Sequence, residues 1–143
     1  MHHLILKYGK YFIFSLYFIL ATPACDDIIE SPIPDVFVSF TIDLNIVNEL
    51  YHEGMSVFFP LVGYGGVIVY CEQPGIYYAF DAACPYDIRP DCIVKNEGPL
   101  ADCPCCGSQF LLINGDPIKP PASVPLKQYH VSLLNSTTLR IHN

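Results

Sequence analysis

The cysteines are the residues of this 143-residue chain whose type and spacing point most directly to chemistry. There are seven, four of them lie between Cys92 and Cys106, and Cys84 comes shortly before that group. Thiolates bind zinc and iron–sulfur clusters, and cysteines outside the cytoplasm also pair as disulfides. The spacing therefore predicts a metal centre, a set of disulfides, or both.

Two short segments carry most of these cysteines. The first contains Cys84-Pro-Tyr86, and the second contains Cys103-Pro-Cys-Cys106 followed by Gly107. The prolines stiffen each segment, and we expect Gly107 to let the backbone approach a ligand closely. Two such loops are suited to holding one metal centre between their tips.

The segments that must position these loops are short and rich in β-forming residues. We expect strands at Val36–Leu44, Met55–Leu61, Gly66–Cys71, Ile76–Asp81, Gln109–Ile113, Lys127–Leu134 and Thr138–His142. Turns are expected at Glu72–Gly75 and at Asn114-Gly115, a dipeptide that favours tight hairpins. Only Ile46–His52 has a helical rhythm, and Cys84–Gly107 has so little hydrophobic period that we expect it to be loop. The pattern predicts an all-β fold, a small antiparallel sandwich or barrel.

The two loop motifs and their flanks resemble the Rieske-type [2Fe–2S] ferredoxin family. That family supplies Cys-x-His from one loop and Cys-x-x-His from the next, followed by Gly-Ser and an aromatic residue. Here Cys84-Pro-Tyr86 and Cys103-Pro-Cys-Cys106 occupy these places, sixteen residues apart, and the similarity spans about Pro60–Val131. It implies a Rieske-like domain over residues 36–143, with a loop-rich cluster-binding subdomain at about 82–121, that transfers single electrons.

The chain departs from the family at both histidine positions. Tyr86 matches the first family histidine and Cys106 matches the second. The five histidines all lie outside the loops: His2, His3, His52, His130 and His142. Because a Rieske cluster owes its raised potential to two histidines on one iron, thiolate ligands imply a lower potential, like that of plant-type ferredoxins.

Three arrangements of the loop cysteines are open. In the first, Cys84, Cys103 and Cys106 bind a [2Fe–2S] cluster, with Cys92 or Tyr86 as the fourth ligand. In the second, the same cysteines hold a structural zinc ion. In the third, no metal binds and the cysteines pair as disulfides.

The family resemblance also implies a particular disulfide. Respiratory Rieske proteins link their two cluster loops by a bridge, and Cys92 and Cys105 match its two ends here. This pairing leaves Cys84, Cys103, Cys106 and Tyr86 around any metal. Cys71 ends an apolar strand, and we expect it to be a buried inert thiol or the partner of a loop cysteine.

The first 24 residues have the pattern of a signal peptide. Lys7 and Lys10 precede an eleven-residue apolar run, and small residues then lead to Cys25. We expect lipidation at Cys25, because Asp26-Asp27 resembles the acidic export tag of lipoproteins of the Bacteroidetes type. Residues 25–35 contain several acids and two prolines, so we expect them to be a tether. An unlipidated secreted protein is the alternative. The predicted location is the bacterial cell envelope, anchored by lipid on the periplasmic or outer-membrane side.

The charge balance excludes one class of partner. The chain has 14 acidic residues and 7 lysines and arginines, a net charge of −7, and the part after Ala24 is more acidic still. Because such a surface repels phosphate backbones, we expect no nucleic-acid binding. We expect an electron carrier, served by an unidentified redox partner protein in the envelope, or a non-redox binding module stapled by zinc or disulfides. Neither hypothesis makes the chain an enzyme by itself.

Overall fold

The computed structural model describes residues 31–143. Its strands are β1 (Ser39–Asp43), β2 (Ser56–Phe59), β3 (Val67–Gln73), β4 (Ile76–Asp81), β5 (Lys95–Glu97), β6 (Leu100–Asp102), β7 (Gln109–Leu111), β8 (Pro117–Lys119), β9 (Gln128–Asn135) and β10 (Thr138–His142). One short 3₁₀ helix, η1 (Asn48–Tyr51), joins β1 to β2. The expected signal peptide and Cys25 lie outside the described residues.

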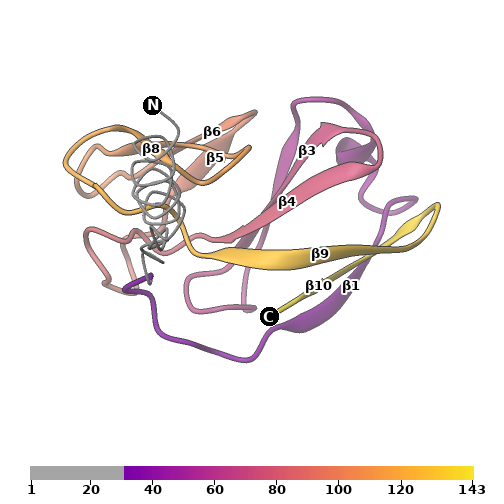
Figure 1. Cartoon of the computed structure of the whole chain (residues 1–143), viewed down its shortest axis with the longest axis horizontal. Coiled ribbons are helices and arrows are strands. Elements are labelled where there is room, and N and C mark those ends of the chain that lie inside the picture. The colour runs from indigo at the N-terminus through magenta and orange to yellow at the C-terminus, as the bar shows by residue number, and fades with distance from the viewer. Residues whose placement is uncertain (1–30) are drawn as a thin grey trace, which may run out of the picture.

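The strands form two antiparallel sheets. The larger sheet has the order β1-β10-β9-β4-β3-β2, and the smaller has the order β5-β6-β7-β8. Figure 1 shows the larger sheet curling and the smaller sheet set beside one of its ends. The all-β antiparallel class predicted from the sequence is confirmed.

Two hydrophobic clusters fill the protein, one on each face of β3 and β4. Ile68 and Phe80 belong to the cluster shared with the smaller sheet, and Val69 and Ala79 belong to the cluster inside the larger sheet. Successive side chains of a strand point to opposite faces, so both faces of this strand pair are covered. This explains why the run from Val67 to Cys71 is entirely buried instead of alternating.

A buried carboxylate joins the end of β4 to its surroundings. Asp81 is fully buried, and its Oδ2 accepts hydrogen bonds from the Tyr64 N–H and the Tyr129 hydroxyl, both at 2.7 Å. Its Oδ1 accepts from the N–H groups of Gly65 and Ala83, both at 2.9 Å. These four donors satisfy the hydrogen-bonding capacity of the buried carboxylate. One of them, the N–H of Ala83, belongs to the residue directly before Cys84. The carboxylate therefore fixes the point at which the first cysteine loop leaves the sheet.

Several predicted elements are found, and others are corrected. The strands predicted at Ile76–Asp81 and Thr138–His142 coincide with β4 and β10, while the other predicted strands shift by a few residues at their ends. The prediction that Cys84–Gly107 is entirely loop is wrong, because β5 and β6 form a hairpin within it. These strands have three residues each and lack a long alternating pattern. The predicted helix at Ile46–His52 is only η1, which buries Leu50 alone.

The described end of the expected tether lies against the domain. Ile33 is buried, and the Lys127 ammonium donates to the Pro34 carbonyl at 3.0 Å and pairs with the Asp35 carboxylate. Between residues 31 and 143, no helix has the length and apolar character needed to span a bilayer.

We predict that Tyr129→Phe lowers the free energy of unfolding by about 1–3 kcal/mol, because a buried acceptor loses its donor. Burial and then the bond to Asp81 raise the pKa of Tyr129. The contribution is therefore present below pH about 10 and decreases above it, where the unfolded phenol ionises. Urea unfolding at neutral and alkaline pH measures both effects. Tyr51→Phe, at an exposed tyrosine, is the control, and equal stability of the two variants would contradict the prediction.

Candidate metal centre

Each cysteine loop is closed at its base by backbone hydrogen bonds. The first loop leaves β4, and the Cys84 N–H donates to the Cys92 carbonyl at 3.2 Å. The second loop joins β6 to β7, where the Cys103 N–H donates to the Ser108 carbonyl at 2.8 Å and the Gly107 N–H donates to the Cys103 carbonyl at 2.9 Å. The sheets therefore hold the loop ends, and the loop tips carry the cysteines.

Three free thiols from the two loops converge. The Sγ atoms of Cys84, Cys103 and Cys106 all lie within 4.8 Å of one another, and those of Cys84 and Cys106 are 3.6 Å apart. Cys84 and Cys103 are buried, whereas Cys106 is half-buried. Two thiolates on one tetrahedral ion, each about 2.3 Å from it, lie about 3.8 Å apart. The group thus fits the spacing and the soft donor type of a thiolate-bound metal.

A disulfide lies beside this group. Cys92 of the first loop is bonded to Cys105 of the second, with their Cα atoms 5.7 Å apart. The Arg89 guanidinium lies 3.0 Å from Cys92 Sγ and makes two hydrogen bonds of 2.8 Å to Asp87. The bridge fastens the two loops to each other. It also takes Cys92, one of the two candidates for the fourth ligand, out of the set of free thiols.

Tyr86 and Cys71 lie in different environments from the three thiols. Tyr86 projects from the first loop with 60% of its surface exposed, unlike the buried thiols of Cys84 and Cys103. Cys71 is a free buried thiol in the cluster inside the larger sheet, among residues that include neither cysteine loop. Of the described histidines, none lies in either loop.

The thiols differ in how readily they ionise. Burial, followed by the hydrogen bond with Cys103, raises the pKa of Cys84 to about 12. Burial, the largest single influence, opposes ionisation of Cys106, but its hydrogen bonds with Ser108 and with the other two thiols together outweigh burial and lower the pKa of this thiol. A metal that binds at neutral pH therefore has to displace a proton from Cys84. Because its pKa is lowered, Cys106 gives up its proton to a metal more readily than Cys84 does.

Ser108 is a contributor that the sequence analysis did not single out. It is fully buried, its Oγ lies 3.2 Å from Cys106 Sγ, and the Ala122 N–H donates to the same Oγ at 2.8 Å. Because that N–H fills an acceptor position, the hydroxyl proton is available to a Cys106 thiolate. The available signal was the Gly-Ser that follows the second family motif, which Gly107-Ser108 matches.

Gly107 has a backbone conformation that favours glycine. Its φ is +77°, a left-handed conformation that side chains disfavour, yet a Cβ placed there would meet no atom within 4 Å. The glycine is therefore required by the turn of the second loop. That the backbone at Gly107 approaches a ligand closely stays a prediction.

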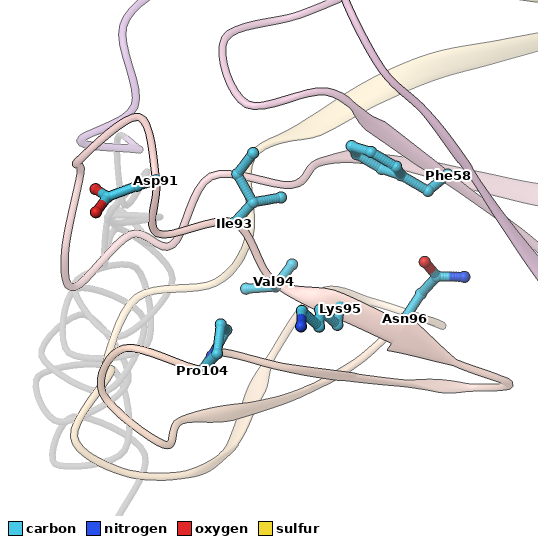
Figure 2. Close-up of a pocket in the computed structure, with 7 residues that line it drawn as sticks. All are labelled: Phe58, Asp91, Ile93, Val94, Lys95, Asn96 and Pro104. Atoms are coloured by element: carbon cyan, nitrogen blue, oxygen red, sulfur yellow. The ribbon is translucent and has the colours of Figure 1, made fainter.

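An open cavity of about 490 Å³ adjoins the second loop. Figure 2 shows Pro104 on one side of it and Phe58 of β2 on the other, with residues 93–96 between them. Its lining is mainly apolar, and Asp91 and Lys95 contribute opposite charges. Since Pro104 is flanked by Cys103 and Cys105, whatever fills this cavity contacts the loop that carries the thiols.

Comparisons with known proteins give a match in structure only. Neither the protein-family models nor the curated proteins contain one that matches the sequence. Among solved structures, the complex of reduced oxygenase and oxidized ferredoxin in carbazole 1,9a-dioxygenase matches at 20% identity with a TM-score of 0.50, covering 73% of this chain and 93% of that one. The chain has a Rieske-like ferredoxin fold.

Two further structures are similar to this chain at lower scores. The ferredoxin of carbazole 1,9a-dioxygenase from Nocardioides aromaticivorans is 19% identical, with a TM-score of 0.49, and covers 75% of this chain and 97% of its own. A Sphingomonas yanoikuyae ferredoxin is 19% identical, with a TM-score of 0.43, and covers 64% of this chain and 88% of its own.

We predict that peptide mapping without reductant finds Cys92 linked to Cys105. Replacing both by serine should lower the free energy of unfolding by about 2–4 kcal/mol, because the bridge closes a loop with a sequence separation of 13 residues. Chemical denaturation of the variant and of the oxidised wild type measures the difference. A linkage of Cys84 to either residue would contradict the assignment.

Proposed function

We propose that this protein is an electron carrier that holds an iron–sulfur centre through Cys84, Cys103 and Cys106. The observation that carries the proposal is the convergence of these three thiols, contributed by the two loops of a Rieske-like fold. Iron–sulfur clusters are bound by cysteine thiolates, and four such ligands give a low-potential centre. One solved structure similar to this chain is a complex of an oxygenase with a ferredoxin, which supports the same role.

The donor set fits a thiolate-rich centre and not a histidine-ligated one. The described loops supply three free thiols and no imidazole. Tyr86 occupies the sequence position of the fourth donor, on the exposed side of the first loop. We propose that the centre takes its fourth ligand from this exposed side, which leaves Cys84 and Cys103 as its protected pair.

When bound, such a centre supplies reversible one-electron transfer. The residues of the chain hold it and set its surroundings. Cys84 and Cys103 are buried, and the hydrogen bond between Cys106 and Ser108 favours the ionised form of Cys106. The bridge between Cys92 and Cys105 keeps the two loops together when the centre is absent.

We propose further that the carrier works in the bacterial envelope, anchored through lipid on Cys25, and passes electrons to a protein there. The motivation is the signal-like sequence of residues 1–24 with the acids after Cys25, together with a disulfide of a kind that persists in oxidising compartments. The partner would approach the cysteine loops, where the centre is nearest to solvent at Cys106 and Tyr86.

A single zinc ion is the second candidate. The distance of 3.6 Å between the sulfurs of Cys84 and Cys106, with all three sulfurs within 4.8 Å, suits ligands of one ion. Ligands on the two irons of a cluster lie farther apart, because the irons themselves are separated. In this case the domain is a binding module whose loops are stapled by zinc and a disulfide.

The identity of the bound metal distinguishes the electron carrier from the zinc-stapled binding module. Protein purified without oxygen is predicted to contain about two irons per chain and to show the visible absorption of a cluster, which Cys103→Ser should largely abolish. Metal analysis and the visible spectrum measure both.

Cys71→Ser is the matched control, since Cys71 is equally buried but lies outside the thiol group. It should keep the iron content of the wild type. Colourless protein that contains one zinc ion would reject the electron carrier and favour the second candidate.

The ligand positions can be tested by restoring the family pattern. We predict that Tyr86→His combined with Cys106→His raises the reduction potential of the centre by about 250 mV or more, because two imidazoles on one iron stabilise the reduced state. Protein-film voltammetry of the wild type and the double variant measures the shift. An unchanged potential would mean that these positions do not face the centre.

A further inference from the structure

Two histidines lie side by side on the outer surface of the larger sheet, away from the cysteine loops in the sequence. His130 is on β9 and His142 is on β10, and the register of the two strands places them directly opposite each other. The register shift between Thr138 and Leu139 produces this pairing of the histidines, since without the shift His142 would oppose Val131. A slip of one residue reverses the face of every side chain, so the bulge is what pairs the two imidazoles.

The spacing of the two rings suits a shared metal ion. Their centroids are 5.5 Å apart and their planes are tilted by 36°. Two imidazoles bound to one tetrahedral ion through nitrogens at about 2.0–2.1 Å have centroids about 5 Å apart. The separation of the two ring centroids is therefore close to the value that chelation requires.

A third residue orients one of the rings. Ser132 Oγ lies 3.2 Å from Nε2 of His142. If Nε2 carries the proton and donates to this oxygen, the other nitrogen, Nδ1, is left with a lone pair for a cation. Ligand histidines commonly have such a partner on the nitrogen that does not bind the metal. His130 is exposed and borders a cavity of about 380 Å³, so water ligands have access.

From these observations, we propose that His130 and His142 form a second metal site that takes a divalent late first-row cation such as Zn²⁺, Ni²⁺ or Cu²⁺. Imidazole is the preferred ligand of these ions. No acidic or cysteine side chain of the described residues joins the pair to make a group of three, so water completes the coordination. The site is independent of the proposed electron-transfer function and clamps β9 to β10.

One positive charge lies near this pair. Arg140 precedes His142 by two residues, so it shares the outer face of β10, and its guanidinium donates to Ser39 Oγ at 3.4 Å. Because a cation at the histidines is repelled by this group, we expect a moderate affinity, well below that of a closed zinc site. Arg140→Gln should strengthen binding.

The test is a titration of the full chain with Zn²⁺, followed by NMR of the imidazole nitrogens. His2→Gln and His3→Gln are included so that His52, His130 and His142 are the only histidines. Reading the imidazoles directly separates this site from any zinc bound by the thiols. The signals of His130 and His142 are expected to shift together with one binding constant, while that of His52 stays in place.

Three variants complete the experiment. His142→Gln should weaken binding at His130 by at least about tenfold, and Ser132→Ala should weaken it by about tenfold by loosening the ring. His52→Gln, at an exposed histidine of another segment, should leave it unchanged. Unshifted signals of His130 and His142 at millimolar zinc, or an affinity at His130 that is indifferent to His142→Gln, would overturn the proposal.

Discussion

The carboxylate of Asp81 is the constraint on which the cysteine loops depend. A buried charge is tolerated only when it is fully hydrogen-bonded, and here four donors from the chain surround it. Two of these donors belong to the segment before β3, one to β9, and one to the residue before Cys84. The end of β4 therefore has a single position relative to three other segments. The first loop starts from this fixed point, and the second loop is tied to it by the disulfide.

The loop cysteines form two groups, one oxidised to a disulfide and one that remains as free thiols. Cys92 and Cys105 are joined and act on the backbone, since they hold the loop tips together whether or not a metal is bound. Cys84, Cys103 and Cys106 remain thiols whose sulfurs lie within 4.8 Å of one another. The hydrogen bond between Cys106 Sγ and Ser108 Oγ contributes to the lowered pKa of Cys106. The chemistry of the site thus depends on which cysteines the fold joins in a disulfide and which it leaves as thiols.

The sequence predicted those features that depend on local patterns. β4 and β10 were found because their residues favour strands and flanking turns mark their ends. The convergence of Cys84, Cys103 and Cys106 followed from the two similar cysteine motifs. The hairpin of β5 and β6 was missed, since Lys95–Glu97 is a polar run whose pairing is set by its neighbours. The opposition of His130 and His142 depends on a bulge, and no local pattern reveals the register of a strand pair.

The two hydrophobic clusters give the protein an internal division. The cluster inside the larger sheet includes Leu50, Cys71 and Leu139 but no residue of the cysteine loops, whereas the other cluster includes Cys84 and Cys103. Damage that begins at the thiols, such as overoxidation, therefore acts first on one core. The other core retains its own packed interior. The chain can in this way keep part of its fold after its thiols have been lost.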